Sequence, residues 1–354
     1  MAGVLESLGS EYEQIVFAHE PDSGLRTIVA IHSTALGPAL GGTRFYPFAS
    51  EEAALADVLR LSKAMSYKNA CAGLDCGGGK AVVIGDPRTD KTPDLLRAYG
   101  RVVDRLNGAY LTTADVGTNA NDMVFVAEST RFVTGTPSGA GDPSPNTAYG
   151  VWSGMRAVAE RAFGEATMAG RHVVVQGVGK VGGGVARLLA EEGARLTLSD
   201  VDAEAVSTLA KELEAGVVAP NEALSTECDV LAPCALGPVV TDATLGAFRC
   251  RAIAGAANNQ LDRPDHGAAL HAAGILYAPD YVLNAGGVIN VAGEVMGFDA
   301  AEARERAAAI ASTLRRVFER SEAERVTPAV AADRLAEERI FSARRRFGGP
   351  GGSR

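Results

Sequence analysis

The sequence predicts an α/β protein of two domains, the second of which has a parallel sheet covered by helices on both faces. Three observations support this prediction. The chain of 354 residues is long for one domain and sufficient for two. Residues 135–146 (GTPSGAGDPSPN) have the composition of a linker or hinge. After this segment, short apolar runs alternate with helical ones, which is typical of βα units.

The first part of the chain predicts two strands followed by two helices. The runs 14–19 and 26–32 are rich in β-branched residues, so each predicts a strand. Ser50 is the expected N-cap of a helix whose first turn holds Glu51 and Glu52 and whose apolar face is Leu55, Val58, Leu59 and Met65. Thr92-Pro93 predicts the start of a second helix, which buries Leu95, Leu96, Tyr99, Val102, Val103 and Leu106.

The second part predicts a regular succession of elements. We expect a long helix over about 147–164, then strand 172–176, helix 181–192, strand 195–199, helix 203–214 and short strands near 229–232, 252–254 and 275–277. Helices near 300–321 and 328–340 end the pattern. The predicted domain limits are 1–140 for the first domain and 141–325 for the second, with residues 326–354 returning to the first.

Charge and cysteine content argue against several classes of protein. The formal net charge of −9 argues against a nucleic-acid partner, which requires a basic face. No stretch approaches the ~18 uninterrupted apolar residues of a membrane span, and the amino terminus lacks the basic and apolar regions of a signal peptide. The five cysteines lack the paired spacing of a zinc site, so we expect no metal. A cytoplasmic protein with reduced thiols is the simplest interpretation.

A glycine-rich segment predicts a dinucleotide site. Gly177, Gly179 and Gly182 follow an apolar strand and open a helix, which is the context that the G-x-G-x-x-G pattern requires. Asp200 ends the next strand about twenty residues on, where a carboxylate accepts from a ribose 2′-hydroxyl and repels a 2′-phosphate. An ordinary turn or cap is the alternative role for Asp200. The predicted cofactor is NAD, bound by Gly177, Val178, Gly179, Lys180, Val181, Gly182 and Asp200.

Two lysines are candidates for chemistry. Lys80 follows three glycines and precedes Ala-Val-Val-Ile, so we expect it at the mouth of an apolar strand, whereas a lone lysine is usually a solvated surface charge. A phosphate-binding P-loop is excluded, because Leu74 and Ala81 stand where its first glycine and its hydroxyl belong. A lysine desolvated beside another ammonium gives up its proton more easily and can act as a general base. The second lysine, Lys68, could hold a substrate carboxylate as a point charge.

Asp115 has two possible roles on the sequence alone. It lies in Thr112-Thr-Ala-Asp-Val-Gly-Thr, just past the expected end of a strand. A carboxylate there could relay protons beside the candidate lysines. It could equally be the N-cap of a helix over 119–127, because aspartate is among the preferred capping residues. The residues by themselves leave both roles open.

Eight motifs in order resemble the glutamate/leucine/phenylalanine/valine dehydrogenase family, and most closely its leucine and valine members. Together they span roughly residues 14–342. They are Leu36-Gly-Pro-Ala-Leu-Gly-Gly-Thr-Arg, Met65-Ser-Tyr-Lys-Asn-Ala, Gly77-Gly-Gly-Lys, Ala114-Asp-Val-Gly-Thr, Val175-Gln-Gly-Val-Gly, Ala232-Pro-Cys-Ala-Leu-Gly, Ala254-Gly-Ala-Ala-Asn-Asn-Gln-Leu and Tyr277-Ala-Pro-Asp-Tyr-Val-Leu-Asn-Ala-Gly-Gly. Several motifs in family order are far more specific than any one of them.

The resemblance implies a fold, an activity and a role for each matching residue. The fold is two domains around a deep cleft, with a substrate domain first and a Rossmann domain second, assembled as a homo-oligomer. The activity is the reversible, NAD-dependent conversion of an L-amino acid into its 2-oxo acid and ammonia. Lys80 is the implied base that activates water and Asp115 assists proton transfer. Lys68, Gly41, Gly42 and Asn259 bind the substrate, and the cofactor site is lined by Arg44, Thr147, Ala235 and Asn258.

The side-chain pocket predicts a branched-chain substrate. Glutamate-specific family members carry a lysine just before the Gly-Gly pair, and here that position is Leu40. Their second contact, a hydroxyl, falls on Val291. A carboxylate buried against Leu40, Val288 and Val291 without a cation would cost several kcal/mol. We therefore expect leucine, valine and isoleucine to react, with phenylalanine as the alternative, since one methylene changes specificity by only about 1–3 kcal/mol.

Two other functional classes are weaker interpretations. A protein that binds NAD without catalysis would have no use for Lys68, Lys80 and Asp115 together. Oxidation of a 2-hydroxy acid usually relies on a histidine, an arginine and an acid, and no histidine here has such a setting.

Overall fold

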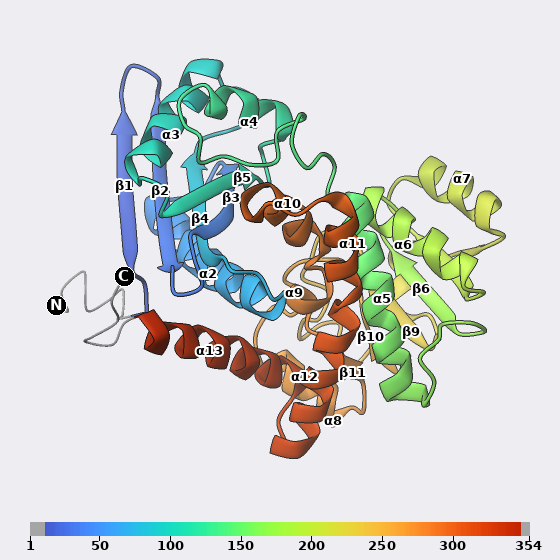
Figure 1. The fold of residues 1–354 in the computed structure, drawn as a ribbon. Coiled ribbons are helices and arrows are strands. Elements are labelled where there is room, and N and C mark those ends of the chain that lie inside the picture. The colour runs from blue at the N-terminus through green and yellow to red at the C-terminus, as the bar shows by residue number, and fades with distance from the viewer. Residues whose placement is uncertain (1–10, 348–354) are drawn as a thin grey trace. The chain divides into compact units, whose positions relative to one another are not determined.

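The computed structural model describes residues 11–347 and divides them into two compact units (Figure 1). Unit 1 contains the described residues up to Asp142, then Val291–Phe298, then those from Ala336 on. Unit 2 contains Pro143–Asn290 and Asp299–Leu335. The first break lies inside the glycine- and proline-rich segment 135–146. Unlike the predicted domain limits, this division groups Val291–Phe298 with unit 1, where Glu294 accepts hydrogen bonds from the backbone of Gly135 and Ala140.

Unit 1 is built on a mixed sheet of five strands in the order β1-β2-β4-β3-β5. β1 pairs antiparallel with β2 and β2 with β4, whereas β4–β3 and β3–β5 are parallel. The strands are β1 (Gln14–Glu20), β2 (Leu25–Ser33), β3 (Ala39–Tyr46), β4 (Gly77–Ile84) and β5 (Tyr110–Ala114). The two strands predicted from β-branched residues, β1 and β2, are confirmed. β4 begins before Lys80, so the prediction that this lysine lies at the mouth of the strand is wrong: it lies inside it.

The helices of unit 1 begin where the sequence predicts. α2 (Glu51–Cys71) is capped by Ser50, whose side chain accepts from the backbone NH of Ala53, and α3 (Pro93–Arg105) is capped by Thr92. α4 (Ala120–Ala127) follows. The deeply buried face of α2 differs from the predicted apolar stripe toward its end, where Ser62, Ser66 and Asn69 face inward. The reason is close packing on the glycines of β4: a Cβ at Gly78 would overlap the backbone of Ser66.

Unit 2 contains a sheet of six parallel strands in the order β11-β10-β9-β6-β7-β8. This order is that of a dinucleotide-binding doubly wound sheet, with β6 as its first strand and β9 across the switch point. The strands are β6 (His172–Gln176), β7 (Arg195–Ser199), β8 (Gly216–Val217), β9 (Val230–Pro233), β10 (Ala252–Ile253) and β11 (Leu276–Tyr277). The predicted α/β class with a parallel sheet in the second domain is confirmed.

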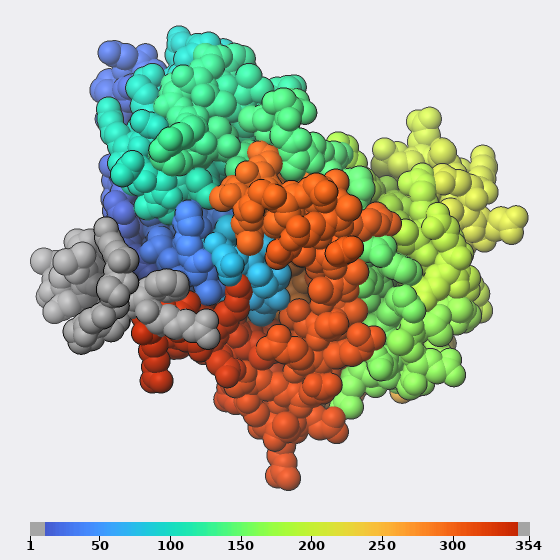
Figure 2. All heavy atoms as spheres, in the orientation of Figure 1, coloured from blue at the N-terminus to red at the C-terminus, as the bar shows by residue number. Residues whose placement is uncertain are grey.

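Helices follow the strands of unit 2 in the expected alternation. They are α5 (Ser144–Phe163), α6 (Lys180–Glu191), α7 (Ala203–Leu213), the 3₁₀ turn η1 (Ala223–Ser225), α8 (Asp265–Ala272), α9 (Asp280–Leu283), α11 (Ala300–Ala308) and α12 (Ile310–Glu324). The single helix predicted near 300–321 is two helices, since α11 ends at Ala308 and α12 begins at Ile310. In the space-filling view, the yellow residues of α7 form part of the surface of unit 2 (Figure 2).

Two helices contribute to both units. α10 (Gly286–Met296) leaves unit 2 after Asn290, and α13 (Pro328–Phe347) joins unit 1 from Ala336 on. Within residues 11–347, no helix is both long and apolar enough to cross a membrane.

Candidate active site

The buried Lys80 forms an ion pair with the partly buried Asp115. Lys80 is the fourth residue of β4, and only 7% of its side chain is exposed. Asp115 directly follows β5, and its Oδ2 lies 2.9 Å from the Lys80 ammonium. β3 lies between these two strands in the sheet, and its neighbours β4 and β5 both run parallel to it. The sheet thus brings together two of the residues that the sequence singled out.

Asp115 also contacts a second cation, Arg44 of β3. The Nε of Arg44 donates to Asp115 Oδ2 at 3.2 Å, and its Nη1 donates to Asp57 of α2 at 2.8 Å. Burial alone would raise the pKa of Asp115, but the neighbouring Lys80 and Arg44 outweigh it and hold that pKa below the ordinary value. Asp115 is therefore an ionised carboxylate between two cations.

The alternative role of Asp115 as a helix cap is wrong. α4 is capped by Asn119, whose side chain accepts from the backbone NH groups of Asn121 and Asp122. Asp122 completes a capping box by accepting from the backbone NH of Asn119. Asp115 instead begins a short turn, in which its own NH donates to the hydroxyl of Thr118.

The predicted substrate residues of unit 1 lie on β3, α2 and α10. Gly41 and Gly42 are inner residues of β3, and the Tyr110 hydroxyl donates to the Gly41 carbonyl at 2.8 Å. Leu40 is fully buried beside them. Lys68 is in the last turn of α2 and is partly buried. Val291 is buried on α10; Val288, one turn earlier on this helix, belongs to unit 2.

Two residues that the sequence analysis missed support the end of α2. The buried amide of Asn69 donates to the carbonyl of Gly77 at 2.6 Å and to that of Leu40 at 3.4 Å, so it ties the start of β4 to β3. Arg339 of α13 donates to the carbonyls of Asn69, Ala70 and Leu74 at 2.8–3.3 Å. Asn69 could have been found from the sequence, because it directly follows the candidate residue Lys68. Nothing in the sequence links residue 339 to this helix.

The glycine-rich turn of unit 2 has the geometry that a dinucleotide needs. Gly177 adopts a φ of 95°, and a Cβ there would lie 2.5 Å from the backbone nitrogen of Ala235. A Cβ at Gly182 would overlap the Gly177 carbonyl, so helix α6 requires glycine to approach β6. A Cβ at Gly179 would meet nothing within 4 Å, which leaves the backbone at the start of α6 open to a phosphate. Lys180 and Val181 form the first turn of α6.

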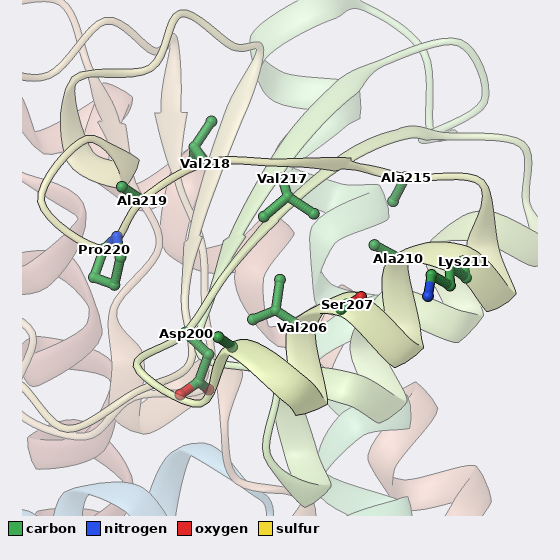
Figure 3. A pocket seen from close by; sticks show the side chains of 11 residues that line it. Asp200, Val206, Ser207, Ala210, Lys211, Ala215, Val217, Val218, Ala219 and Pro220 are labelled. Atoms are coloured by element: carbon green, nitrogen blue, oxygen red, sulfur yellow. The ribbon is translucent and has the colours of Figure 1, made fainter.

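Asp200 lies beside this turn at the carboxyl end of β7. Its carboxylate accepts from the backbone NH of Val178 at 2.7 Å and from that of Asp202 at 3.1 Å. The cap of α7 is Asp202 and not Asp200, so the capping role considered for Asp200 is wrong, whereas its bond to the backbone NH of Asp202 fits the turn role. Asp200 borders a pocket of about 550 Å³ between α7 and the segment from β8 to Pro220, lined by Val206, Ser207, Ala210, Lys211, Val217 and Val218 (Figure 3).

The remaining predicted residues of unit 2 follow β9 and β10 or begin α5. Asn258 accepts from the amide of the buried Asn284 at 2.8 Å, a partner that the sequence analysis missed. Asn259 adopts a φ of 54°, in the left-handed region that asparagine tolerates better than most residues. The Thr147 hydroxyl donates to the Pro143 carbonyl, and a Cβ at Gly287 would lie 2.8 Å from that hydroxyl. In the range 11–347, no three His, Cys, Asp or Glu side chains are arranged to hold a metal ion.

Comparisons with known proteins identify the family. Residues 12–132 match the Glu/Leu/Phe/Val dehydrogenase dimerisation domain, and residues 199–348 match the Glutamate/Leucine/Phenylalanine/Valine dehydrogenase domain. A leucine dehydrogenase of Bacillus cereus is 52% identical, with 94% of this chain and 92% of that protein covered. A valine dehydrogenase of Streptomyces virginiae is 51% identical, with 94% and 95% covered.

Solved structures agree with this assignment. The crystal structure of an L-tryptophan dehydrogenase from Nostoc punctiforme is 42% identical, with a TM-score of 0.86 over 96% of this chain and 98% of that one. A glutamate dehydrogenase from Thermus thermophilus, at 23% identity and a TM-score of 0.79 over 99% and 94% of the two chains, shares the fold. The family implies a nicotinamide cofactor, and the open turn at Gly179 fits its phosphates. The chain therefore belongs to the glutamate/leucine/phenylalanine/valine dehydrogenase family and is an amino acid dehydrogenase.

Proposed function

We propose that this enzyme catalyses the reversible, NAD-dependent oxidative deamination of leucine, valine or isoleucine to the 2-oxo acid and ammonia. The observation that carries the chemistry is the ion pair of the buried Lys80 with Asp115, 2.9 Å apart. The choice of substrate rests on relatives named leucine and valine dehydrogenase that are about half identical over more than nine-tenths of the chain.

Lys80 is the general base of this proposal. A nicotinamide cofactor held by the turn of Gly177, Gly179 and Gly182 would supply the acceptor for the hydride of the substrate α-carbon, and loss of that hydride would leave the amino acid as an iminium. Once the Lys80 ammonium has released its proton to solvent, its neutral Nζ takes a proton from the water that attacks the iminium carbon. The ammonium formed in this step is stabilised by the ionised Asp115, because opposite charges interact strongly where water is largely excluded. The same carboxylate orients Nζ and assists the later transfer of the proton to the departing amine.

Binding of the amino acid backbone falls to groups around this pair. Lys68, in the last turn of α2, would hold the substrate carboxylate as a point charge, with the backbone of Gly41 and Gly42 beside it. Asn69 and the Tyr110 hydroxyl fix the strands that carry these groups. Asn259 would contribute from unit 2. We expect each of these groups to set the position and the affinity of the substrate, whereas Lys80 and Asp115 take part in the proton transfer.

The apolar positions favour a branched side chain over glutamate. Leu40, Val288 and Val291 offer no cation for a second carboxylate, whose burial without one costs several kcal/mol. The neighbour named L-tryptophan dehydrogenase, at 42% identity, makes an aromatic amino acid such as phenylalanine or tryptophan the second candidate.

We assign the preference for NAD to Asp200, and the contacts between subunits of an oligomer to unit 1. The Asp200 carboxylate at the end of β7 would accept from a ribose 2′-hydroxyl and repel a 2′-phosphate, so NAD is preferred over NADP. Arg44, Thr147, Ala235 and Asn258 would complete the cofactor site.

The description of residues 12–132 as a dimerisation domain supports a homo-oligomer. The cytoplasmic location stays a prediction.

The test is a screen of reduced-cofactor production over the natural L-amino acids, with NAD and NADP in parallel. The expected result is turnover of leucine, valine and isoleucine with NAD, little with glutamate, and little with NADP. Glutamate as the best substrate would refute the argument from Leu40. Phenylalanine or tryptophan as the best substrate would favour the second candidate. The absence of amino acid turnover with either cofactor would refute the proposal.

A further inference from the structure

Two cysteines lie opposite each other at the start of neighbouring strands in unit 2. Cys228 precedes β9 and Cys250 precedes β10. These strands are parallel, and Ala252 is paired with Val230. Each cysteine stands two residues before the paired residue of its strand, so the same register places Cys250 opposite Cys228. The backbone NH of Cys228 donates to the carbonyl of Arg249 at 3.2 Å, so the chains are already adjacent at the cysteines.

The two thiols are close enough to influence each other. Cys228 and Cys250 each shift the pKa of the other, and both side chains are half-buried against the same apolar cluster, which includes Val174 and Phe248. Neighbouring strands are about 4.8 Å apart, and a disulfide requires Cα atoms about 4.4–6.8 Å apart. The backbone therefore does not have to move far for the sulfurs to bond.

The interaction between the two thiols makes the sulfurs unequal. The neighbouring Cys228 thiol lowers the pKa of Cys250 below its ordinary value despite burial, whereas Cys250 and burial raise the pKa of Cys228. Cys250 is thus the sulfur that ionises first and attacks an oxidant, because the thiolate is the nucleophile.

We propose that Cys228 and Cys250 are a redox modification site, which a peroxide converts into a reversible intramolecular disulfide that cross-links β9 to β10. The Cys250 thiolate attacks one oxygen of hydrogen peroxide, the O–O bond breaks and hydroxide leaves, so Cys250 becomes a sulfenic acid. The Cys228 sulfur then attacks the Cys250 sulfur, the S–O bond breaks, and the hydroxyl leaves as water with the Cys228 proton. Two thiols are oxidised, and the peroxide is reduced to two waters.

The position of the pair predicts stabilisation of the fold. The cysteines lie at the amino ends of β9 and β10, whereas Ala235 and Asn258 of the proposed cofactor site follow the carboxyl ends of these strands. Closing the loop between residues 228 and 250 restricts the unfolded chain, which typically stabilises a protein by raising the free energy of unfolding. The disulfide should therefore raise the Tm by an amount on the order of 5 °C.

The experiment treats the full-length protein with a small excess of hydrogen peroxide, blocks the remaining thiols with an alkylating agent, and maps the peptides without reduction. The expected result is a peptide pair joined through Cys228 and Cys250, released by dithiothreitol, together with a higher Tm. Cys228→Ser and Cys250→Ser should each lack the cross-link and the rise in Tm, whereas Cys234→Ser, which changes a half-buried cysteine of the same unit, should keep the cross-link.

Several results would overturn the proposal. These are oxidation of either cysteine to sulfinic or sulfonic acid without a cross-link, a disulfide confined to other cysteines such as Cys71 and Cys76, a bond between two chains, or a cross-link that leaves the Tm unchanged. None of these results depends on which amino acid the enzyme oxidises, so the proposed activity is tested separately.

Discussion

Replacing Asp115 with asparagine removes one negative charge from between two cations and changes the shape of the side chain little. In the wild type, Asp115 Oδ2 lies 2.9 Å from the Lys80 ammonium and 3.2 Å from the Arg44 guanidinium. The asparagine variant leaves Lys80 buried without this carboxylate. Arg44 keeps its ion pair with Asp57. The change therefore acts mainly on Lys80.

The expected loss of stability is moderate. Removing one partner of a buried ion pair costs about 3–5 kcal/mol. Asp115 retains 25% of its side-chain exposure, and solvent screens part of the interaction, so we expect the free energy of unfolding to fall by about 2–3 kcal/mol. Turnover should fall about 100-fold or more, because the group that orients and stabilises the protonated base is lost.

The dependence on pH separates the charge from other effects of the substitution. The folded-state pKa of Asp115 is below its ordinary value, so its stabilising contribution is fully present above that ordinary value and is lost as the pH falls through the folded one. The difference in unfolding free energy between wild type and Asp115→Asn should thus be constant near neutral pH and shrink below about pH 4. Urea unfolding at several pH values measures it.

A matched variant distinguishes a catalytic role from a structural one. Asp122 forms a comparable ion pair with Lys91 at 2.8 Å, also in unit 1, with 11% of its side chain exposed. Asp122→Asn should lose stability as Asp115→Asn does but keep its turnover. If both variants lose stability equally and both keep their turnover, Asp115 is a structural residue and the reasoning about the proton is refuted.

Three further predictions follow from single residues. Lys80→Ala should abolish nearly all turnover with little change in NAD affinity by titration, and a variant that keeps a tenth of its rate would contradict the assignment of the base. Asp200→Asn should raise the rate with NADP relative to NAD, and equal wild-type rates with both cofactors would rule out the role of this carboxylate. Tyr99→Phe removes a fully buried hydroxyl bonded to Thr43 at 2.5 Å and to Thr112 at 2.9 Å. Because the two threonines still bond each other, the loss should be about 1 kcal/mol by urea unfolding, and an unchanged midpoint would show that the hydroxyl contributes nothing.

The elements that could be predicted are those whose signals are local. Ser50 and Thr92-Pro93 specify helix starts, because each cap bonds a backbone NH only three residues further on. The glycines of 177–182 specify a turn whose geometry follows from their missing Cβ atoms. β3 has no such signal, because Gly41 and Gly42 lower its strand propensity; it is a strand because β4 and β5 pair with it on either side.

The residues of the candidate site could be predicted from the sequence, but the contacts between them could not. The sequence points to Lys80 and Asp115 separately, but their contact depends on the order β4-β3-β5, which no local pattern encodes. The sequence analysis expected a second ammonium to tune Lys80, whereas the structure pairs this lysine with a carboxylate. Contacts between distant parts of the chain, such as those of Arg339, depend wholly on the tertiary fold.

The contact of Arg339 with the end of α2 bears on the order in which parts of the chain are synthesised and stabilised. The helix that carries Lys68 is made early in synthesis, yet three carbonyls at and just after its end receive their guanidinium partner only when residue 339 has been added. A nascent chain that has already folded its first sheet still lacks this support. We expect that proteolytic trimming or fusion at the carboxyl terminus, remote in sequence from the lysine, would weaken carboxylate binding before it affected the glycine-rich turn.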